Sequence, residues 1–549
     1  MQPLDVETLH CPRGMQSPVG PSRSGGAGSR GAPIGRYSGE AARSAGRTPD
    51  TSEINRVNDV RPDAVIILAA GEGTRMKSTL PKVLHPLGGA PLLGHAMRAA
   101  AGAGAAETVV VVRHQRDRVA AFIEEYAQRS GLACRTADQD EVKGTGRAVE
   151  CGLEVLPADL TGTVVVTMGD VPLLSAETIS ELTRVHHEER AAVTVITSVL
   201  EDAKSYGRIV RDADGHVERI VEFKDATEAE RGIREINSGI YAFDAAVLRR
   251  ELANVRSDNA QGEKYLTDVL QLARAAGGTV AAHVLTDLWQ TEGVNDRVQL
   301  AQLGKELNRR TCERHMRAGV TIIDPDTTWI DVDVTIGQDT RLLPGTQLLG
   351  ATSIGAEATI GPDVTLTDCE VGDGAEVKRA EGLLAVIGDG AKVGPFSYLR
   401  PGTELGAKGK IGGFVETKNT KIGEGAKVPH LTYAGDADIK EGANIGAGTI
   451  FANYDGVHKH RTVVGRHSFI GSDAVLVAPV EIADGAYVAA GSAVTEAVGP
   501  GQLAVARGHQ RNVDGWVARQ RPGTQTEAAA LAAAQPPSSA TPDSSEDTK

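Results

Sequence analysis

The sequence predicts an α/β domain with a mostly parallel sheet, joined by a long helix to a parallel β-helix of six-residue repeats. Two observations carry this prediction. In the first half of the chain, short apolar runs alternate with stretches of helical periodicity, which is typical of strands buried on both faces with helices between them. In the second half, aliphatic residues recur at every sixth position, which indicates a solenoid whose flat sides are short strands.

The two ends of the chain show no hydrophobic period. Residues 1–60 are rich in Gly, Ser, Pro and Arg, and residues 521–549 are rich in Ala, Ser, Thr and Pro. Such compositions bury too little apolar surface to offset the entropy lost on ordering. We expect both segments to be disordered, and the first to be either a regulatory tail or the result of a start codon placed too far upstream.

The first folded domain is expected to span residues 61–297. Its strand-like apolar runs are residues 64–68, 108–112, 163–167 and 192–196, and its intervening helical stretches include residues 94–103 and 117–128. Strands that alternate with helices in this way form a parallel sheet covered by helices.

A charged stretch with apolar residues at helical spacing follows, and it predicts a linking helix over residues 298–318. The six-residue period then defines a second domain over residues 319–520. Its in-register aliphatic positions are Ile336, Leu342, Leu348, Ile354, Ile360 and Leu366, then Ile387, Val393, Leu399, Leu405 and Ile411, and finally Val464, Ile470, Leu476, Ile482, Val488 and Val494. Glycine follows several of them, and small residues permit tight corners. Such hexapeptide repeats resemble the left-handed β-helix family.

Composition narrows the range of partners. The 549 residues carry a formal net charge of −14, which argues against nucleic acid or a membrane surface as the main partner. The five cysteines form no C-x-x-C pair, which favours reduced thiols. No apolar run is long enough to span a bilayer, and the start of the sequence has no signal-peptide pattern. We therefore expect a cytoplasmic protein.

A glycine-rich loop, residues 69–75, directly follows the first predicted strand. α/β sheets bind ligands at the carboxyl ends of their strands, and glycines let backbone N–H groups approach an anion. The loop is neither a P-loop, since no Gly-Lys-Ser/Thr follows, nor a dinucleotide fingerprint, since Met76 stands where the third glycine belongs. Arg75 and Lys82 add the positive charge that a triphosphate requires.

The pattern L-x-A-G-x-G-T-R-M, which starts at Leu68 and is followed by Pro81-Lys82, resembles the sugar-nucleotidyltransferase family. Further segments of the family pattern follow in order at residues 139–146, 169–173, 206–208, 221–225, 236–239 and 292–295. The resemblance implies a Rossmann-like domain in which a sugar-1-phosphate oxygen attacks the α-phosphorus of a nucleoside triphosphate. Such chemistry relies on positioning and charge neutralisation, without a protein nucleophile.

By resemblance, Asp170 and Asn295 hold Mg²⁺, an oxygen-only site that suits a hard cation, while Arg75 and Lys82 are catalytic and stabilise phosphate charge. Gln139, Gly144 and Thr145 correspond to the uracil site, and Gly207, Glu222 and Asn237 to the sugar site. The full set expected to bind UTP or the UDP-sugar is Leu68, Ala69, Ala70, Gly71, Lys82, Gln139, Gly144, Thr145, Met168, Gly169, Asp170, Gly207, Glu222, Asn237 and Asn295. Two residues depart from the family pattern: Glu72 in the phosphate loop and Lys143 beside the uracil segment.

Five segments interrupt the hexapeptide period with polar and aromatic residues: 394–402, 414–418, 428–433, 444–449 and 451–456. A β-helix of this kind can be purely architectural and serve trimer formation. Polar and aromatic residues gathered in irregular coils favour instead a binding cleft between adjacent subunits.

These segments resemble the acetyltransferase half of a family of bifunctional bacterial enzymes, which acetylate glucosamine-1-phosphate and then uridylylate the product. The resemblance covers residues 62–518. It implies that His430 is the general base, because imidazole is suited to take a proton near neutral pH. On its own, His430 would be one loop histidine among 14. By the same resemblance the sugar phosphate is bound by Arg400, Lys418, Tyr433 and Asn444, and acetyl-CoA by Ala447, Asn453, Tyr454, Ser472, Ala490 and Arg507.

The expected function is therefore the synthesis of UDP-N-acetylglucosamine. The substrates would be glucosamine-1-phosphate, acetyl-CoA, N-acetylglucosamine-1-phosphate and UTP, with Mg²⁺ as cofactor, in a homotrimer with neither nucleic-acid nor membrane partners. Two alternatives stay open at this point. One is a single-activity nucleotidyltransferase with a β-helix for trimerisation, and the other is a non-catalytic sugar-nucleotide sensor.

Overall fold

The computed structural model describes residues 60–259 and 261–534. All but the last residue of the predicted N-terminal extension, residues 1–60, lie outside the described residues. No helix in the two described ranges combines the length and apolarity needed to cross a lipid bilayer.

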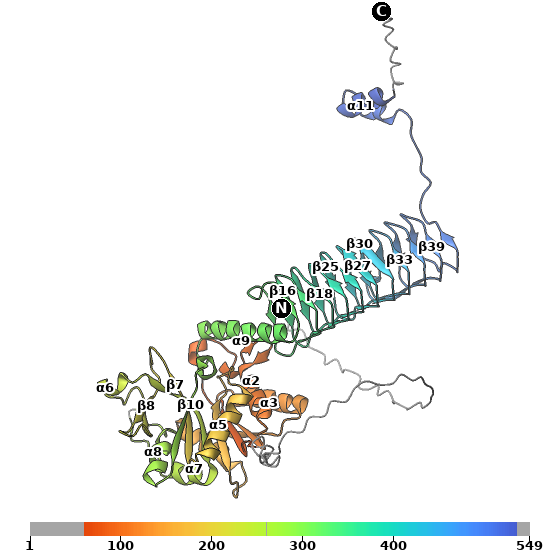
Figure 1. Cartoon of the computed structure of the whole chain (residues 1–549). Coiled ribbons are helices and arrows are strands. Elements are labelled where there is room, and N and C mark those ends of the chain that lie inside the picture. Colours follow the sequence, from red (N-terminus) through yellow and green to blue (C-terminus); the bar gives the residue numbers. More distant parts are fainter. Residues whose placement is uncertain (1–59, 260, 535–549) are drawn as a thin grey trace, which may run out of the picture. The chain divides into compact units, whose positions relative to one another are not determined.

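The first half of the described chain folds around a mixed sheet in the order β11-β7-β10-β6-β1-β4-β5 (Figure 1). Strands β6, β1, β4 and β5 are parallel, whereas β10 runs antiparallel to both β6 and β7. The bounds are β1 Ala64–Leu68, β4 Glu107–Val112, β5 Cys134–Asp138, β6 Thr163–Met168, β7 Val193–Val199, β10 Glu235–Asp244 and β11 Val280–Val284, with β8 Arg208–Arg211 and β9 Val217–Val221 attached beside β10. All four apolar runs that the sequence singles out lie within or overlap these strands.

Helices cover both faces of this sheet. Val65 and Ile67 of β1 pack with one set of helices, and Ile66 packs with the other, because successive residues of a strand point to opposite faces. The first set is α2 Leu92–Gly102, α3 Arg116–Ser130 and α5 Ala176–Glu188; the second is α4 Thr145–Glu154, α7 Ala245–Leu252 and α8 Asp268–Ala275. Since both faces are covered, the central strands are apolar throughout, which explains their continuous apolar runs.

Helix α9, Arg297–Arg317, agrees with the predicted linking helix to within one residue at each end. The Asp296 carboxylate caps it by accepting hydrogen bonds from the backbone N–H groups of Val298 and Gln299. Toward its end, the buried Asn308 amide bonds both the Thr328 carbonyl and the Ile330 N–H at the start of the β-helix. The two bonds thus give partners to backbone groups at the edge of the first coil of the β-helix.

The second half is a left-handed parallel β-helix whose short strands stack into three sheets of 11, 10 and 9 strands in the described part of the chain (Figure 1). The first sheet runs from β12 Thr321–Ile322 to β41 Leu503–Ala504, the second from β13 Trp329–Ile330 to β40 Ala493–Val494, and the third from β14 Thr335–Ile336 to β38 Val480–Ile482. Pairing of Leu342 with Ile360 shows that one coil contains three hexapeptides. The aliphatic positions of the predicted period form its core, and only Ile336, in the third sheet's first strand, is partly exposed.

One coil is longer than its neighbours. Tyr433 pairs with Ile450 on the next coil, and Ile450 pairs with Val475 on the one after it. The coil from Ile450 to Val475 is therefore seven residues longer than a regular 18-residue coil. The extra residues form a loop around the bridge between Tyr454 and Lys459. This loop carries two of the residues expected to bind acetyl-CoA.

The tail differs in one respect from the expectation of disorder over residues 521–549. Residues Gln525–Ala533 form helix α11, capped by Thr524, and none of its side chains is buried. Five alanines in nine residues explain a helix without packing, because alanine has the highest helix propensity.

Candidate active sites

The glycine-rich loop and Lys82 are packed closely against each other. Gly73 has a left-handed backbone conformation, with φ of 64°, and a Cβ there would lie 2.5 Å from the Cβ of Lys82. Only glycine meets both requirements. The loop therefore brings its backbone N–H groups and the Lys82 ammonium to the same end of β1.

A cavity of about 490 Å³ opens at this end of the sheet. It is lined by ten of the residues expected to bind UTP: Leu68, Ala69, Ala70, Gly71, Lys82, Gln139, Gly144, Thr145, Met168 and Asp170. Glu72, Val83, Arg113, Lys143, Ala148 and Glu263 complete the lining. Both departures from the family pattern, Glu72 and Lys143, thus face the same space as the expected nucleotide ligands.

Each of the two expected metal ligands is paired with one of the two expected catalytic cations. Lys82 Nζ forms an ion pair with the Asp170 carboxylate, and Arg75 Nη2 donates a 2.7 Å hydrogen bond to Asn295 Oδ1. The backbone N–H of Val294 donates to the Asp170 carbonyl at 2.9 Å, so the two ligand-bearing loops are adjacent. A carboxylate and an amide oxygen on neighbouring loops fit Mg²⁺, which takes one or two protein oxygens and leaves room for phosphates.

The Gln139 side chain has a defined orientation. Its Nε2 donates to the backbone carbonyls of Val142 and Gly144, at 3.0 and 3.3 Å. Because both amide hydrogens are used, Oε1 is left as an acceptor, which suits the imide N–H of uracil. A Cβ on Gly144 would lie 2.2 Å from the Lys264 carbonyl, so glycine is required there.

The three expected sugar-binding residues form a separate group that does not line this cavity. Asn237 N–H donates to the Gly207 carbonyl at 2.9 Å, and a Cβ on Gly207 would lie 3.5 Å from Glu222 Oε1. Asn237 Oδ1 accepts a 2.9 Å bond from Tyr241, which leaves its Nδ2 to donate elsewhere. Burial raises the pKa of Glu222, and the negative charges of the nearby Asp225, Asp268 and Glu263 raise it further.

In the β-helix, three cations converge near one corner. Arg400 donates a 2.8 Å hydrogen bond to Glu416, and Lys418 lies one strand further at the same corner. The ammonium of Lys459, from the inserted loop, lowers the pKa of Lys418 by like-charge repulsion. Such repulsion marks a place where a phosphate would be stabilised.

His430 ends β30, Lys427–His430, and its imidazole is exposed. The imidazole has no hydrogen-bond or ion-pair partner within the described ranges, while its backbone carbonyl accepts from Thr432 Oγ1 at 2.8 Å. Tyr433 begins the next strand, β31 Tyr433–Gly435, and Asn444 lies beside Lys427 on the strand that follows β30 in its sheet. His430 and Tyr433 therefore flank one corner of the solenoid, whereas Asn444 is level with Lys427 at the other end of β30.

The residues expected to bind acetyl-CoA include a stack along successive coils. The Ala447 carbonyl accepts from the N–H of Asp473, the Ser472 carbonyl from the N–H of Gly491, and the Ala490 carbonyl from Arg507 Nη1. On the inserted loop, Asn453 Nδ2 donates a 2.6 Å bond to Asp436, and the ring of Tyr454 is 60% exposed. The stack offers a long site that runs along the solenoid.

Residues 65–238 match the MobA-like NTP transferase domain. The Bifunctional protein GlmU of Mycolicibacterium vanbaalenii is 60% identical over 85% of this chain and 94% of its own length. The Bifunctional protein GlmU of Pseudarthrobacter chlorophenolicus is 59% identical over 89% and 99%, respectively. This chain belongs to the GlmU family. A solved UDP-glucose pyrophosphorylase in complex with UDP-glucose overlaps 45% of the chain at 16% identity, with a TM-score of 0.37.

Most positions that carry the resemblance to GlmU proteins are gathered into a few places by the fold. The cavity also includes residues that the sequence did not single out, chiefly Arg113 and Glu263. They come from distant segments and show no motif of their own. Lys459 was missed too, although its place just after the aromatic segment 451–456 of an interrupted repeat could have indicated it.

Proposed function

We propose that this chain makes UDP-N-acetylglucosamine in two steps, with one site in each half. The C-terminal half transfers acetyl from acetyl-CoA to glucosamine-1-phosphate, and the N-terminal half transfers UMP from UTP to the product, with release of pyrophosphate. The similarity to bifunctional GlmU proteins over 85–89% of the chain carries this proposal, since it includes both halves. Residues 61–297 would be the uridylyltransferase domain, 298–318 the linker and 319–520 the acetyltransferase domain.

In the uridylyltransferase site, Asp170 and Asn295 would hold Mg²⁺. The ion would neutralise phosphate charge and align the reacting groups. Arg75 and Lys82, which pair with these ligands in the free protein, would turn to the phosphates when metal and UTP bind. The loop N–H groups after Leu68 would hold the phosphates, Gln139 Oε1 would accept from the uracil imide, and Glu222 and Asn237 would bind the sugar.

In the acetyltransferase site, His430 would take a proton from the ammonium group of glucosamine-1-phosphate. The freed nitrogen attacks the thioester carbonyl, a C–N bond forms, and the C–S bond breaks. The nitrogen loses its second proton as the amide forms, the leaving thiolate of coenzyme A takes up one proton, and His430 releases the other to solvent. Arg400, Lys418 and Lys459 would bind the sugar phosphate, with Tyr433 and Asn444 on the sugar. Acetyl-CoA would lie along the stack from Ala447 to Arg507, beside Asn453 and Tyr454.

We further propose that the protein is a homotrimer that works in the cytoplasm. Phe396, Phe414 and Leu431 form an exposed apolar column on successive coils, with side chains 55–63% exposed. The two phenylalanine rings stack with centroids 5.3 Å apart. A second copy of the chain is the partner best suited to this column, because it would also cover the exposed His430, which immediately precedes Leu431 in the chain.

A coupled assay tests the two activities together. Full-length protein is supplied with glucosamine-1-phosphate, acetyl-CoA, UTP and Mg²⁺, and both free thiol and pyrophosphate are measured. Both products are expected. If pyrophosphate forms only when N-acetylglucosamine-1-phosphate is supplied ready-made, the chain is a single-activity nucleotidyltransferase, and if neither product forms it is the non-catalytic alternative.

A further inference from the structure

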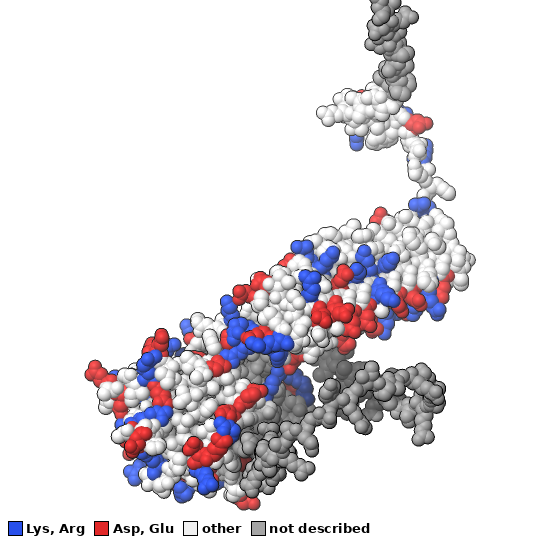
Figure 2. Space-filling model, in the orientation of Figure 1, with Lys and Arg blue, Asp and Glu red and all other residues white. Residues whose placement is uncertain are grey.

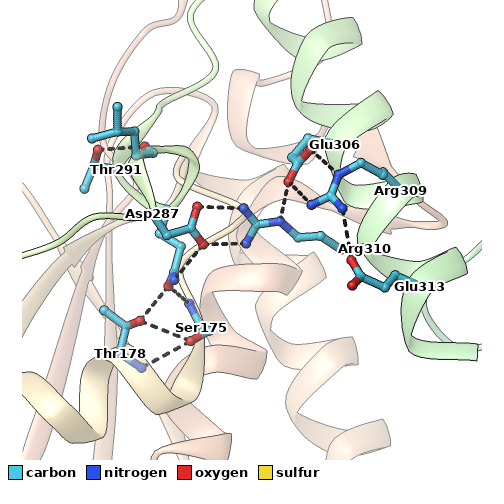
Figure 3. A network of polar contacts seen from close by, with 10 residues as sticks. Ser175, Thr178, Asp287, Thr291, Glu306, Arg309, Arg310 and Glu313 are labelled. Atoms are coloured by element: carbon cyan, nitrogen blue, oxygen red, sulfur yellow. Dashed lines mark hydrogen bonds and ion pairs between the residues drawn. The ribbon is translucent and has the colours of Figure 1, made fainter. Parts of the chain in front are cut away.

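A network of polar side chains joins helix α9 to the loops on which the proposed metal ligands lie (Figure 3). Arg310 of α9 donates two hydrogen bonds to Asp287, one to each carboxylate oxygen, both of 2.8 Å. Arg310 Nε also donates to Glu306 at 2.7 Å. A guanidinium held by two carboxylates has a fixed plane, and it therefore fixes the Asp287 carboxylate.

Asp287 in turn orients the amide of Gln290, which is buried in the short helix η3, Leu288–Thr291. Gln290 Nε2 donates to Asp287 Oδ2 at 3.0 Å. Its Oε1 accepts from the Ser175 N–H at 3.0 Å and from Thr178 Oγ1 at 2.7 Å. A side-chain amide can be turned so that its oxygen and nitrogen exchange places. Because the Asp287 carboxylate accepts from Gln290 Nε2, Gln290 Oε1 is turned toward the start of α5.

The contacts of Gln290 join two loops that matter for the uridylyltransferase site. One loop leads from Asp170 to Ser175, and the other leads from Gln290 to Asn295. The N–H of Val294 and the carbonyl of Asp170 join the same loops a second time, at 2.9 Å. The N–H of Asn295 donates to Gln299 of α9 at 2.8 Å, so α9 holds the second loop near both its ends.

The charge state of the network suits this arrangement. The hydrogen bonds from Arg310 lower the pKa of Asp287, and those from Arg309 and Arg310 lower the pKa of Glu306. Both carboxylates are therefore ionised at neutral pH, and the side chain of Glu306 is only 9% exposed. The Arg310 and Asp287 side chains are 29% and 36% exposed, so their geometry depends on the two parallel hydrogen bonds between them and on the bond from Arg310 to the buried Glu306.

We propose that Arg310 and Asp287 are positioning residues for uridylyl transfer, which act through Gln290 on the separation of the Asp170 and Asn295 oxygens. This inference rests on the proposed function, because it takes these two oxygens as Mg²⁺ ligands. Neither Arg310 nor Asp287 lines the cavity at the end of β1. Mg²⁺ demands a nearly ideal octahedral geometry, so residues that orient its ligands typically change affinity or activity by about 10–100-fold.

The test compares Arg310→Gln with Arg309→Gln in the full chain. Both arginines bond Glu306, but Arg309 bonds Glu313 instead of Asp287, so it is a matched control. We expect Arg310→Gln to lower kcat/KM for uridylyl transfer about 10-fold or more, and Arg309→Gln to change it less than about twofold. The rate of acetyl transfer by both variants should stay within about twofold of the wild-type rate, which would show that the variants are folded.

A second readout does not depend on turnover. Mn²⁺ binding in the presence of UDP-N-acetylglucosamine, measured by electron paramagnetic resonance, should weaken by about 10-fold in Arg310→Gln and in the milder Asp287→Asn. The double variant should be no weaker than either single variant, since both act through one contact. Equal effects of Arg309→Gln and Arg310→Gln, multiplying effects in the double variant, or unchanged Mn²⁺ binding would each overturn the proposal. Wild-type protein without uridylyl transfer would contradict the proposed function instead.

Discussion

At the residue scale, the uridylyltransferase site of the free protein is already neutralised internally. Lys82 pairs with Asp170, and Arg75 bonds Asn295, so the two cations and the two proposed metal ligands stabilise each other before substrate binds. Figure 2 shows acidic and basic residues interspersed on the visible face, which fits a protein that holds anionic substrates by a few converging cations. Binding of Mg-UTP would exchange these internal pairs for pairs with phosphate and metal.

Lys82 gives the first prediction. Lys82→Met removes a cation that is proposed to contact the reacting phosphates, so kcat for uridylyl transfer should fall by about 10²–10³-fold. Acetyl transfer should not change, because the other half of the chain carries it. Lys77→Met is the control: Lys77 lies just after the same loop, and its exposed side chain has no hydrogen-bond or ion-pair partner within the described ranges. The measurement is pyrophosphate release by both variants. Equal rates for Lys82→Met and Lys77→Met would disprove the role of Lys82.

His430 gives the second prediction. His430→Ala removes the only side chain proposed to deprotonate the sugar amine, so acetyl transfer should fall by about 10²–10⁴-fold while uridylyl transfer is spared. His216→Ala, in an exposed turn of the other half, serves as the control. Equal loss of both activities in His430→Ala would show that the two sites are not separate.

Glu222 gives a third prediction, in which stability and binding change in opposite directions. Its raised pKa means that the ionised carboxylate destabilises the free fold. This penalty is absent below the ordinary pKa near 4.5 and becomes complete as pH rises through the raised value. Glu222→Gln should therefore raise the melting temperature at pH 7–8 but not near pH 4.

Activity provides the other half of this prediction. The same Glu222→Gln substitution should raise KM for N-acetylglucosamine-1-phosphate by about 10-fold, because a carboxylate that accepts from sugar hydroxyls is replaced by a weaker acceptor. Glu218→Gln, on the neighbouring part of β9 and exposed, is a control. A variant that is both less stable at neutral pH and normal in KM would contradict the assignment.

At the element scale, the core of the β-helix is built from the inward-facing aliphatic residues of its short strands. Ile411 is fully buried beneath the coil that carries His430, whereas its neighbour Lys410 points outward. Ile411→Ala should destabilise the β-helix by about 2–5 kcal/mol, and Lys410→Ala by about 0.5 kcal/mol or less. Each coil contacts only its neighbours, so the damage should stay in this half.

Residual activity after heating checks the prediction for Ile411. Acetyl transfer by Ile411→Ala should be lost at a temperature at least ~4 °C lower than in the wild type, while uridylyl transfer is lost at the usual temperature. Parallel loss of both activities would show that the halves unfold as one cooperative unit.

At the scale of the whole molecule, the exposed column of Phe396, Phe414 and Leu431 is the surface proposed to contact a second copy of the chain. Phe414→Asp places a charge in the proposed subunit contact, so solution mass should fall from trimer to monomer and acetyl transfer should be lost. Val386→Asp, on the third sheet of the solenoid, carries the same charge on another surface and should leave the trimer intact. A monomeric wild type with full acetyl transfer would exclude a site between subunits.

Much of this molecule could be predicted from local sequence patterns. The hexapeptide period identifies the buried positions of the β-helix, since its register repeats without long-range ambiguity, and apolar runs locate strands such as β1 and β6. Helix α9 was predicted to within one residue at each end, because its apolar spacing and its charges are both local signals. The motifs after Leu68, at Asp170 and at Asn295 were sufficient to indicate nucleotidyl transfer.

Tertiary structure decided what depends on residues distant in sequence. The pairing of Lys82 with Asp170, the proximity of Lys459 to Lys418, and the line from Arg310 through Asp287 and Gln290 to Ser175 have no local signal. Apart from Asp287 and Gln290, the partners lie tens of residues or more apart, and any of these side chains could equally be a solvated surface group. The sequence alone therefore determined the two repeating architectures and the motif residues, whereas the folded chain decided which charges meet, because a charge finds its partner only once the strands and helices that carry both have packed.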